Sequence, residues 1–299
     1  MNTQSYVLVT AAFNEEAFIE GTILSVIAQT HRPIRWVIVS DGSRDHTDDI
    51  VKRYAAQYPF VCLLRISEDH PHNFAAQVDA INAGVAELRG LDYRFIGNLD
   101  ADVSMEAEYF EQLMTKFAQN QQLGLGGGSI HEKDADGIFR PRKTNNVRSV
   151  AHAVQFFRRE CFESISAYVP LPYGGPDSHA ETMARIKGWH VTGFPELRVH
   201  HHRPTGSVGG LLRSSFRQGK MDYSLGYHPL FEFAKSLRRI WVRPYVVGAV
   251  ARLGAFWLSY VTREKRYVSV EFMEFSHREQ KQRLWDSFGA LTWSHMRKR

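Results

Sequence analysis

Two aspartates two residues apart, Asp100 and Asp102, follow an apolar run that ends at Leu99. In an extended segment residues i and i+2 point to the same side, so the two carboxylates share one face. Like charges held that close repel unless a cation lies between them or one carboxylate is protonated. Carboxylate oxygens suit Mg²⁺ or Mn²⁺, with a substrate phosphate completing the coordination shell. The pair therefore predicts a divalent-metal site, although a solvated turn ahead of a helix would carry aspartates too.

The segments on either side of this pair indicate a strand before it and a helix after it. Residues 93–99 are predicted to form a short buried strand. Apolar residues then recur at helical spacing from 106 to 117, with Ser104 as the expected N-cap. Asp100 and Asp102 should therefore lie on a loop at the carboxyl end of a strand, where open α/β sheets bind their ligands.

The first hundred residues alternate between apolar runs and helical patterns. Buried strands are predicted at 6–10, 35–40 and 61–66, and helices at 15–28, from 47 through 58, and at 73–88. This alternation predicts parallel βαβ units in a doubly wound, mostly parallel sheet flanked by helices. Polar residues end three of the strands, at 14–15, 41–45 and 100–102, so they should line one edge of the sheet, where a nucleotide would lie. Neither a G-x-G-x-x-G nor a Walker phosphate loop occurs, which argues against dinucleotide and P-loop sites.

Length and composition are those of a globular protein. The 299 residues are 43 % apolar and 23 % charged, which fits one large α/β domain with an appendage or two domains. Two cysteines, Cys62 and Cys161, give neither a disulfide framework nor a metal-site spacing. They predict buried free thiols in a reducing compartment. The first residues lack the basic and apolar regions of a signal peptide, so we expect a cytoplasmic protein.

The charge is distributed unevenly along the chain. Residues 1–199 carry 19 Lys and Arg against 25 Asp and Glu, a net charge of −6. Residues 200–299 carry 18 against 7, a net charge of +11. A basic segment joined to an acidic body indicates an anionic partner, either nucleic acid or a membrane surface. The apolar content of the basic segment favours the membrane.

Three of the polar loops resemble the motifs of family-2 glycosyltransferases. Residues 10–16, TAAFNEE, look like the P-x-Y-N-E-E opening of that family, with Thr10 and Ala11 in place of the leading proline. Residues 40–47 look like its D-D-G-S-x-D-x-T loop, with Ser40 in place of the first aspartate. Residues 100–102 look like its D-x-D metal motif. Three motifs in the right order over about a hundred residues make a specific match.

The resemblance implies a GT-A (Rossmann-like) fold, a nucleoside-diphosphate sugar as donor, and Mn²⁺ or Mg²⁺ as cofactor. In such enzymes the first two loops hold the nucleoside, and the D-x-D motif holds the metal against the diphosphate. Asp102 is the better candidate for direct coordination, and Asp100 for a ribose or water-mediated contact. The residues implied in donor binding are Ala12, Phe13, Glu15, Asp41, Asp100 and Ala101.

Asp177 precedes a predicted helix, at the place where the family carries a Glu-Asp pair. Pro176 stands where the glutamate of that pair would be. Sugar transfer needs a base that takes the acceptor hydroxyl proton as the hydroxyl attacks the anomeric carbon. An ionised carboxylate at a helix N-terminus suits that role. We expect Asp177 to be this base rather than a simple helix cap, with Glu181, one helical turn on, as the second choice.

Three adjacent histidines, at 200–202, alternate in direction if the chain is extended there. In many GT-A enzymes a histidine at this place reaches the metal or the diphosphate. The resemblance therefore implies His201 and His202 as further metal ligands, without a choice between them. A zinc site is less favoured, because no cysteine or second histidine cluster is placed to complete it.

Residues 206–299 are expected to form a basic, aromatic-rich helical segment after a GT-A domain at 1–205. Arg217, in a predicted helix, is expected to help hold the donor diphosphate. The apolar run 245–261 is shorter than the ~20 residues of a spanning helix, and Arg252 at its centre is costly in hydrocarbon. We expect a helix that lies in the membrane interface with its arginine snorkelling, or else an ordinary core helix of a small subdomain.

The sequence thus predicts an inverting glycosyltransferase of polysaccharide biosynthesis, bound peripherally to the inner face of the plasma membrane. It would transfer a sugar to a hydroxyl of a polyprenyl-linked glycan, with an anionic membrane surface and no nucleic acid as partner. One alternative acceptor is a polyprenyl phosphate, as in dolichyl-phosphate mannosyltransferase-like enzymes, which needs no base. A nucleotidyltransferase is less favoured, because residues 12–15 lack the glycine-rich, basic loop of that class. The remaining functional class to consider is a nucleic-acid-binding protein that acts through the basic segment.

Overall fold

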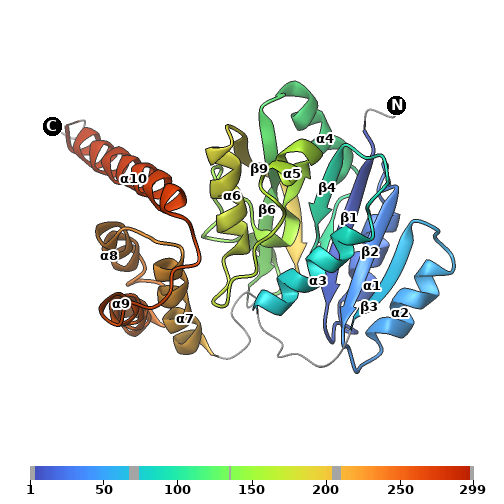
Figure 1. Cartoon of the computed structure of the whole chain (residues 1–299), viewed down its shortest axis with the longest axis horizontal. Helices are drawn as coiled ribbons and strands as arrows, with labels where there is room; N and C mark the ends of the chain where they lie inside the picture. The colour runs from blue at the N-terminus through green and yellow to red at the C-terminus, as the bar shows by residue number, and fades with distance from the viewer. Residues whose placement is uncertain (1–3, 67–73, 135, 204–209, 297–299) are drawn as a thin grey trace. The chain divides into compact units, whose positions relative to one another are not determined.

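The computed structural model describes residues 4–66, 74–134, 136–203 and 210–296, with side chains as far as residue 286 (Figure 1). The chain divides into two compact units. The first, the α/β unit, contains residues up to 172 together with 176–204. The second, the helical unit, contains residues 173–175 and those from 205 onward.

The first half of the α/β unit consists of parallel strands joined by helices, as the sequence pattern predicts. Its strands are β1 (Tyr6–Ala12), β2 (Arg35–Asp41), β3 (Val61–Ile66) and β4 (Phe95–Asn98). Its helices are α1 (Ile19–Ile27), α2 (Thr47–Ala55) and α3 (Phe74–Ala86). β1 pairs in parallel with β2 and β4, and β2 with β3. β1 and β2 are almost wholly buried, which is why they read as continuous apolar runs.

The second half of the unit extends the same sheet with strands of mixed direction. Its strands are β5 (Val103–Met105), β6 (Leu123–Lys133), β7 (Phe139–Pro141), β8 (Phe156–Arg158) and β9 (His190–His201). Its helices are α4 (Tyr109–Gln119), the 3₁₀ turn η1 (His152–Val154), α5 (Arg159–Ser164) and α6 (Pro176–Ile186). The sheet order is β3-β2-β1-β4-β8-β6-β9-β5, with β7 paired to β6.

The expected parallel arrangement therefore holds for β1 to β4 and gives way to a mixed sheet beyond them. β8 is antiparallel to both β4 and β6, and β5 is antiparallel to β9, whereas β6 and β9 are parallel. β7 forms a hairpin with the end of β6. Antiparallel neighbours need no helical crossover between them. The regular α/β alternation of the first hundred residues is consequently interrupted in this half, where β6 is followed directly by β7 and then, after the turn η1, by β8.

The expected helix cap at Ser104 is wrong. Ser104 lies in β5, where it is the register partner of His200 in β9, and α4 begins only at Tyr109. Pairing with a distant strand satisfies the backbone here, and sequence-local capping patterns cannot anticipate it. The glycine-rich segment that follows α4 is likewise a strand, β6. A Cβ added to Gly128 would lie 2.3 Å from the carbonyl oxygen of Leu197 in β9, so the close strand contact needs glycine.

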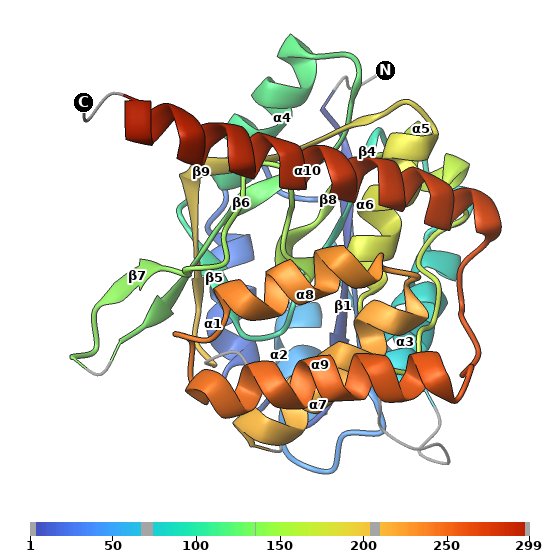
Figure 2. The same cartoon turned by 90° about the vertical axis from the view of Figure 1, so that its left-hand side faces the viewer.

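The helical unit contains α7 (Leu211–Ser224), α8 (Pro229–Arg238), α9 (Tyr245–Val261) and α10 (Val270–Met296) (Figures 1 and 2). α7 and α9 pack closely at Gly219, where an added Cβ would lie 2.0 Å from the carbonyl oxygen of Arg252. Within the described part of the chain, no helix combines the length and the apolar character that crossing a membrane requires.

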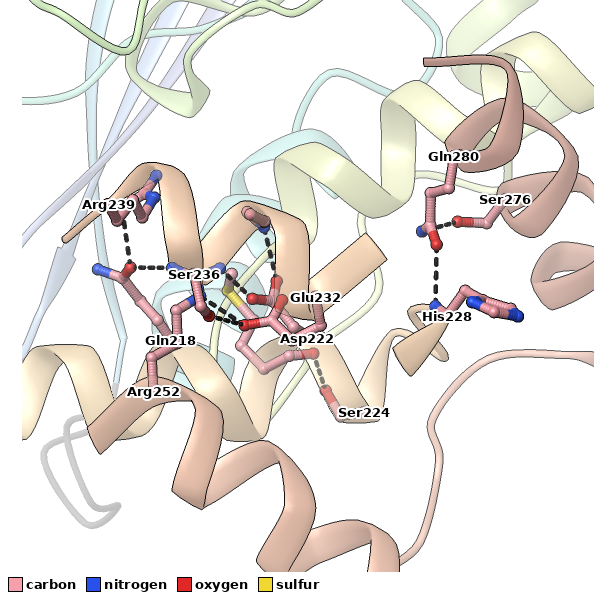
Figure 3. A network of polar contacts seen from close by, with 12 residues as sticks. Gln218, Asp222, Ser224, His228, Glu232, Ser236, Arg239, Arg252, Ser276 and Gln280 are labelled. Carbon is pink, nitrogen blue, oxygen red and sulfur yellow. Dashed lines mark hydrogen bonds and ion pairs between the residues drawn. The ribbon is translucent and has the colours of Figure 1, made fainter. Parts of the chain in front are cut away.

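The expected snorkelling of Arg252 is wrong, because the side chain is 2 % exposed and lies inside the helical unit. Its Nε atom donates to Oε1 of Glu232 at 2.8 Å, and Nη1 donates to Oε1 of Gln218 at 2.6 Å (Figure 3). Its Nη2 atom bonds to the carboxylate of Asp222. Asp222 also pairs with Lys235 at 3.0 Å. Partners on α7 and α8 hold the guanidinium inside, so it cannot reach toward a headgroup.

Candidate active site

The loops that follow β1 and β2 are tied together by side chain to backbone hydrogen bonds. The amide of Asn14, which has a φ of 54°, donates to Oγ of Ser43 at 3.2 Å. In return the amide of Arg44 donates to Oδ1 of Asn14 at 2.9 Å. The amide of Glu15 donates to Oγ1 of Thr47 at 2.8 Å, and α1 begins only at Ile19, four residues after the expected start. The first two motifs consequently form one surface.

The sequence-predicted donor residues of these loops lie at the carboxyl ends of their strands. Ala12 ends β1 and Asp41 ends β2, and both are buried. Phe13, the next residue after β1, is half-buried. Ala101, beyond β4, is also buried, and its carbonyl oxygen accepts a hydrogen bond from Oγ1 of Thr22 at 2.8 Å. That bond fixes the backbone between the two aspartates of the third motif against α1.

Asp100, Asp102 and His201 come together at the end of β4 and β9. Each offers a ligand atom, and these atoms all lie within 4.8 Å of one another. The Nε2 atom of His201 is 3.3 Å from Oδ1 of Asp102. The contact depends on the antiparallel pairing of β5 with β9, in which Val103 is the register partner of His201. Two carboxylates and one imidazole are a donor set that fits Mn²⁺, and Mg²⁺ through the oxygens.

His200 and His202 lie apart from this group. The Nε2 atom of His202 is 2.8 Å from Oγ of Ser104. The ring centroids of His200 and His202 lie 4.3 and 5.5 Å from that of Phe139. Alternation along the strand therefore presents His201 to the carboxylates and turns its two neighbours elsewhere. Of the two histidines expected as metal ligands, only His201 belongs to the cluster.

Glu132, which the sequence reasoning missed, faces the other ring nitrogen of His201. Glu132 is the register partner of His201 in the parallel pairing of β6 and β9. The Nδ1 atom of His201 lies 3.5 Å from Oε1 of Glu132. Burial alone would lower the pKa of His201, but the carboxylates of Asp102 and Glu132 raise it to about 9. Only the strand register, which no motif encodes, reveals this neighbour.

Arg203, also missed, connects the first motif with the third. Its guanidinium pairs with the carboxylate of Glu15, and its Nε atom lies 3.7 Å from Oδ2 of Asp102. Burial raises the pKa of Glu15 to about 7, although the charge of Arg203 opposes the shift. The residue expected to bind the nucleoside is therefore held by an arginine one residue beyond the three histidines.

His152 joins Asp100 to the region that carries Asp177. Its Nδ1 atom lies 3.7 Å from Oδ1 of Asp100. Burial works against the charged imidazole, yet the carboxylate of Asp100 raises the pKa of His152, and the charge of Asp177 adds to the effect. Nearby, Nε2 of Gln155 donates to the carbonyl oxygen of Asp177 at 3.5 Å. The turn η1 and the residue that follows it thus link the β4 loop to the start of α6.

Asp177 and Glu181 have different environments although both lie on α6. Asp177 is in the first turn and partly exposed, and its Oδ1 atom accepts from the amide of Ser178 at 2.8 Å. Glu181 is 4 % exposed, and its Oε1 atom accepts from the amide of Val150 at 2.7 Å and from Oγ of Ser149 at 2.9 Å. Burial raises the pKa of Glu181 to about 7. Glu181 is therefore buried and hydrogen-bonded to the segment 149–150, whereas the carboxylate of Asp177 is accessible.

Arg217 belongs to the helical unit. Its Nη1 atom donates to the carbonyl oxygen of Tyr173 at 2.8 Å, within the same unit. Its expected contact with the donor diphosphate stays a prediction.

Comparison with known proteins decides the family. Residues 7–174 match the family described as Glycosyl transferase family 2, which is more than half of the chain. The chain belongs to this family. The three motif loops, at 10–16, 40–47 and 100–102, all fall inside the matched region, so the family expected from them is confirmed.

Two curated relatives within this family are the "Uncharacterized glycosyltransferase EpsJ" of Bacillus subtilis and the "Dolichyl-phosphate beta-glucosyltransferase ALG5A" of Trichomonas vaginalis. The first is 27 % identical over 177 residues, covering 52 % of this chain and 48 % of the relative. The second is 32 % identical over 139 residues, covering 42 % of this chain and 41 % of the relative. The chain therefore spans about half the length of these relatives or less.

A solved structure shares the fold over nearly the whole chain. It is the mannosyltransferase PcManGT from Pyrobaculum calidifontis, described as a complex with GDP-Man and Mn²⁺. The TM-score is 0.56 at 18 % identity, with 97 % of this chain and 83 % of the other covered. The likeness confirms the expected GT-A type of α/β fold, with its curled mixed sheet flanked by helices.

Proposed function

We propose that this family-2 member transfers a sugar, with inversion, from a nucleoside-diphosphate sugar to a hydroxyl of a lipid-linked glycan in polysaccharide biosynthesis. The observation that carries the proposal is the convergence of Asp100, Asp102 and His201 at the carboxyl end of β4. In a sheet of this kind that end is where ligands bind.

The donor would lie across the joined loops after β1 and β2. Glu15 and Asp41 are the groups that would bond the ribose and the base, with Ala12 and Phe13 offering backbone and ring surface. Arg203 sits between Glu15 and Asp102, so its positive charge is available to the donor diphosphate at the same edge. These assignments rest on the family motifs and on the hydrogen bonds that join the loops.

Asp102, Asp100 and Nε2 of His201 would hold the divalent cation. When bound there, Mn²⁺ or Mg²⁺ neutralises the charge that builds on the leaving nucleoside diphosphate. Nε2 of His201 must be unprotonated to act as a ligand, so the ring proton must sit on Nδ1, the atom that faces Glu132. Glu132 would accept that proton in a hydrogen bond and so fix the ring in the competent tautomer.

Asp177 would take the proton of the acceptor hydroxyl as the hydroxyl oxygen attacks the anomeric carbon. One in-line displacement of that kind inverts the configuration. Partial exposure and a place in the first turn of α6 favour a carboxylate that the acceptor hydroxyl can reach. Glu181 stays the second choice, because it is 4 % exposed and its Oε1 atom already accepts two hydrogen bonds.

A second candidate is transfer to a polyprenyl phosphate, and the name of the Trichomonas vaginalis relative favours it. A phosphate acceptor already carries a nucleophilic oxyanion and would need no base. Replacement of Asp177 by Asn distinguishes the two reactions, because only hydroxyl acceptors depend on proton removal. A nucleotidyltransferase stays the least favoured candidate, since the loop after β1 is neither glycine-rich nor basic.

A thermal-shift screen of nucleoside diphosphates and their sugars, with and without Mn²⁺, tests the donor and metal assignments. A bound donor raises the melting temperature by mass action, and we expect the rise to require Mn²⁺. Asp102→Asn should abolish the part of the rise in melting temperature that depends on Mn²⁺. Asp92→Asn is the matched control, because Asp92 is exposed and precedes the opposite end of β4. An equal shift in both variants would contradict the assignment.

We further propose a cytoplasmic protein bound peripherally to the inner face of the plasma membrane. A lipid-linked acceptor would be reached there. The net charge of +11 over residues 200–299 supports this location. The surface that would make the contact can be identified within the helical unit.

A further inference from the structure

α9 presents an apolar face outward and carries its one charge inward, whereas an ordinary surface helix has a polar outward face. Arg252 is the only charged residue in its seventeen positions, and it is 2 % exposed. The outward positions recur at three- and four-residue spacing and so form one strip. The exposed members of this strip are Val246, Val247, Val250, Trp257, Leu258 and Val261, each between 43 % and 76 % exposed.

The buried ion pairs lock α9 in this orientation. Arg252 bonds to Glu232 of α8 and to Asp222 of α7, and both carboxylates are fully buried (Figure 3). Turning α9 to bury the apolar strip would leave these buried charges without partners, which is strongly unfavourable. The apolar strip is therefore a fixed feature of the folded helical unit.

α8, which packs against α9, adds apolar side chains of its own (Figure 2). Leu230, Phe233 and Leu237 are 68 %, 53 % and 54 % exposed and recur at helical spacing. Trp241, between the two helices, is 85 % exposed. Exposed apolar residues at this density mark an interaction site rather than ordinary surface.

Exposed cations flank the strip at both ends. Arg238 and Arg243 precede α9, and Arg263 and Lys265 follow it. Aromatic side chains that carry a polar atom, Tyr245, Trp257 and Tyr260, are exposed along the same helix. Cations at both ends of an apolar strip with interfacial aromatics match the boundary between acyl chains and anionic headgroups.

We infer that α9 and α8 form the surface by which this protein binds an anionic lipid bilayer. The helix α9 lies in the membrane plane, its strip among the acyl chains and its flanking cations at the headgroup phosphates. This membrane surface rests on the proposed function, in which the acceptor is linked to a lipid and is therefore reached at a membrane. A second copy of the chain would also cover the strip, but it would bring two sets of flanking cations together, which is unfavourable.

Vesicle sedimentation with the full chain tests the inference. The vesicles are phosphatidylcholine alone or with roughly one third phosphatidylglycerol, an anionic content that gives a negative surface potential. We expect much stronger binding to the anionic vesicles. Val250→Asp should weaken it about tenfold or more, because it places a charge in the centre of the apolar strip. Val261→Asp, at the 76 % exposed end of the helix, is a second variant with little risk to folding.

Two control variants separate the apolar and electrostatic parts. Leu24→Asp changes a 49 % exposed leucine on α1 of the α/β unit, and its binding should equal that of the wild type. The double variant Arg238→Glu with Lys265→Glu should lose the preference for anionic over neutral vesicles. A folded Val250→Asp or Val261→Asp variant that binds as the wild type does would overturn the inference.

Two further measurements separate lipid binding from self-association and from donor binding. Sedimentation velocity without vesicles should show that the wild type does not self-associate through the strip. Self-association that Val250→Asp removes would show that the strip binds a second copy, and the inference would then be wrong. The donor- and Mn²⁺-dependent thermal shift should be the same in Val250→Asp and in the wild type. Vesicle binding without any donor shift would refute the proposed function alone, and a donor shift without vesicle binding would refute the membrane surface alone.

Discussion

The Nδ1 atom of His201 lies 3.5 Å from Oε1 of Glu132, on the neighbouring strand β6. The other ring nitrogen, Nε2, lies 3.3 Å from Oδ1 of Asp102. A carboxylate behind a histidine ligand orients the ring and raises its basicity, and such partners commonly matter for metal affinity. The relationship makes Glu132 a positioning residue for the proposed metal site, although it belongs to none of the recognisable motifs.

Replacing Glu132 by Ala should weaken Mn²⁺ binding about 10- to 100-fold, the usual effect of losing such a partner. Glu132→Gln should lose less, because its amide oxygen can still accept the Nδ1 proton of His201. Titration calorimetry with Mn²⁺ alone measures both affinities. Glu196→Gln, a half-exposed carboxylate of β9 that pairs with Lys116, is the control and should bind as the wild type does. Unchanged affinity in Glu132→Ala would remove Glu132 from the site.

Replacing Asp177 by Asn should lower kcat for a hydroxyl acceptor about 10²- to 10⁴-fold, the usual contribution of a general base. The donor-induced thermal shift should stay, because the residue is not expected to contact the nucleotide. Glu163→Gln, an exposed carboxylate of α5, serves as the control. Full turnover of the hydroxyl acceptor by Asp177→Asn would exclude the base role.

The burial of Glu181 should make stability depend on pH. Its pKa is raised from an ordinary value of 4.5 to about 7, so the folded state keeps a proton that the unfolded state releases between these values. The free energy of unfolding should therefore fall as pH rises through that window. Urea unfolding of the wild type and Glu181→Gln at pH 5 and 7.5 isolates this contribution, because the other groups are common to both.

The variant Glu181→Gln cannot lose a proton at this position. The wild type should consequently be more stable relative to the variant at pH 5 than at pH 7.5. If the stability of the wild type minus that of the variant stays constant or increases from pH 5 to pH 7.5, the buried carboxyl is already ionised in this range.

Replacing Arg252 by Ala should destabilise the helical unit by about 3–5 kcal/mol, because Asp222 and Glu232 would be left buried without their partner. Unfolding followed by circular dichroism measures the loss. Arg263→Ala, an exposed arginine just after α9, should change stability by less than about 0.5 kcal/mol. Equal stability of the two variants would contradict the structural role of the buried network.

Much of the first half of the fold could be predicted from the sequence. The strands at 6–12 and 35–41 are the expected buried runs, whereas in the strand at 61–66 only Val61 is buried. The helices between these strands show a clear apolar period. Such patterns are local, and the motif loops follow each strand directly. The aspartates at 100 and 102 could be placed at a strand end for the same reason.

The rest depends on contacts between distant segments. Glu132 meets His201 only because β6 and β9 pair in one particular register. Ser104 lies in a strand only because β9 returns beside it. Arg252 interrupts an apolar run and so suggested an interfacial cation, whereas partners on α7 and α8 bring it inside. A one-dimensional pattern shows that a charge is present on a helix, but not which neighbour neutralises it.

Asp100, Asp102 and His201 are proposed above to serve a metal-dependent glycosyl transfer. Its most direct test is the release of nucleoside diphosphate from a panel of nucleotide sugars, measured with Mn²⁺ and with a chelator. We predict that at least one donor is cleaved only with the metal, and that Asp102→Asn abolishes the release while Asp92→Asn leaves it intact. Release that is unaffected by the chelator and by Asp102→Asn would contradict the account.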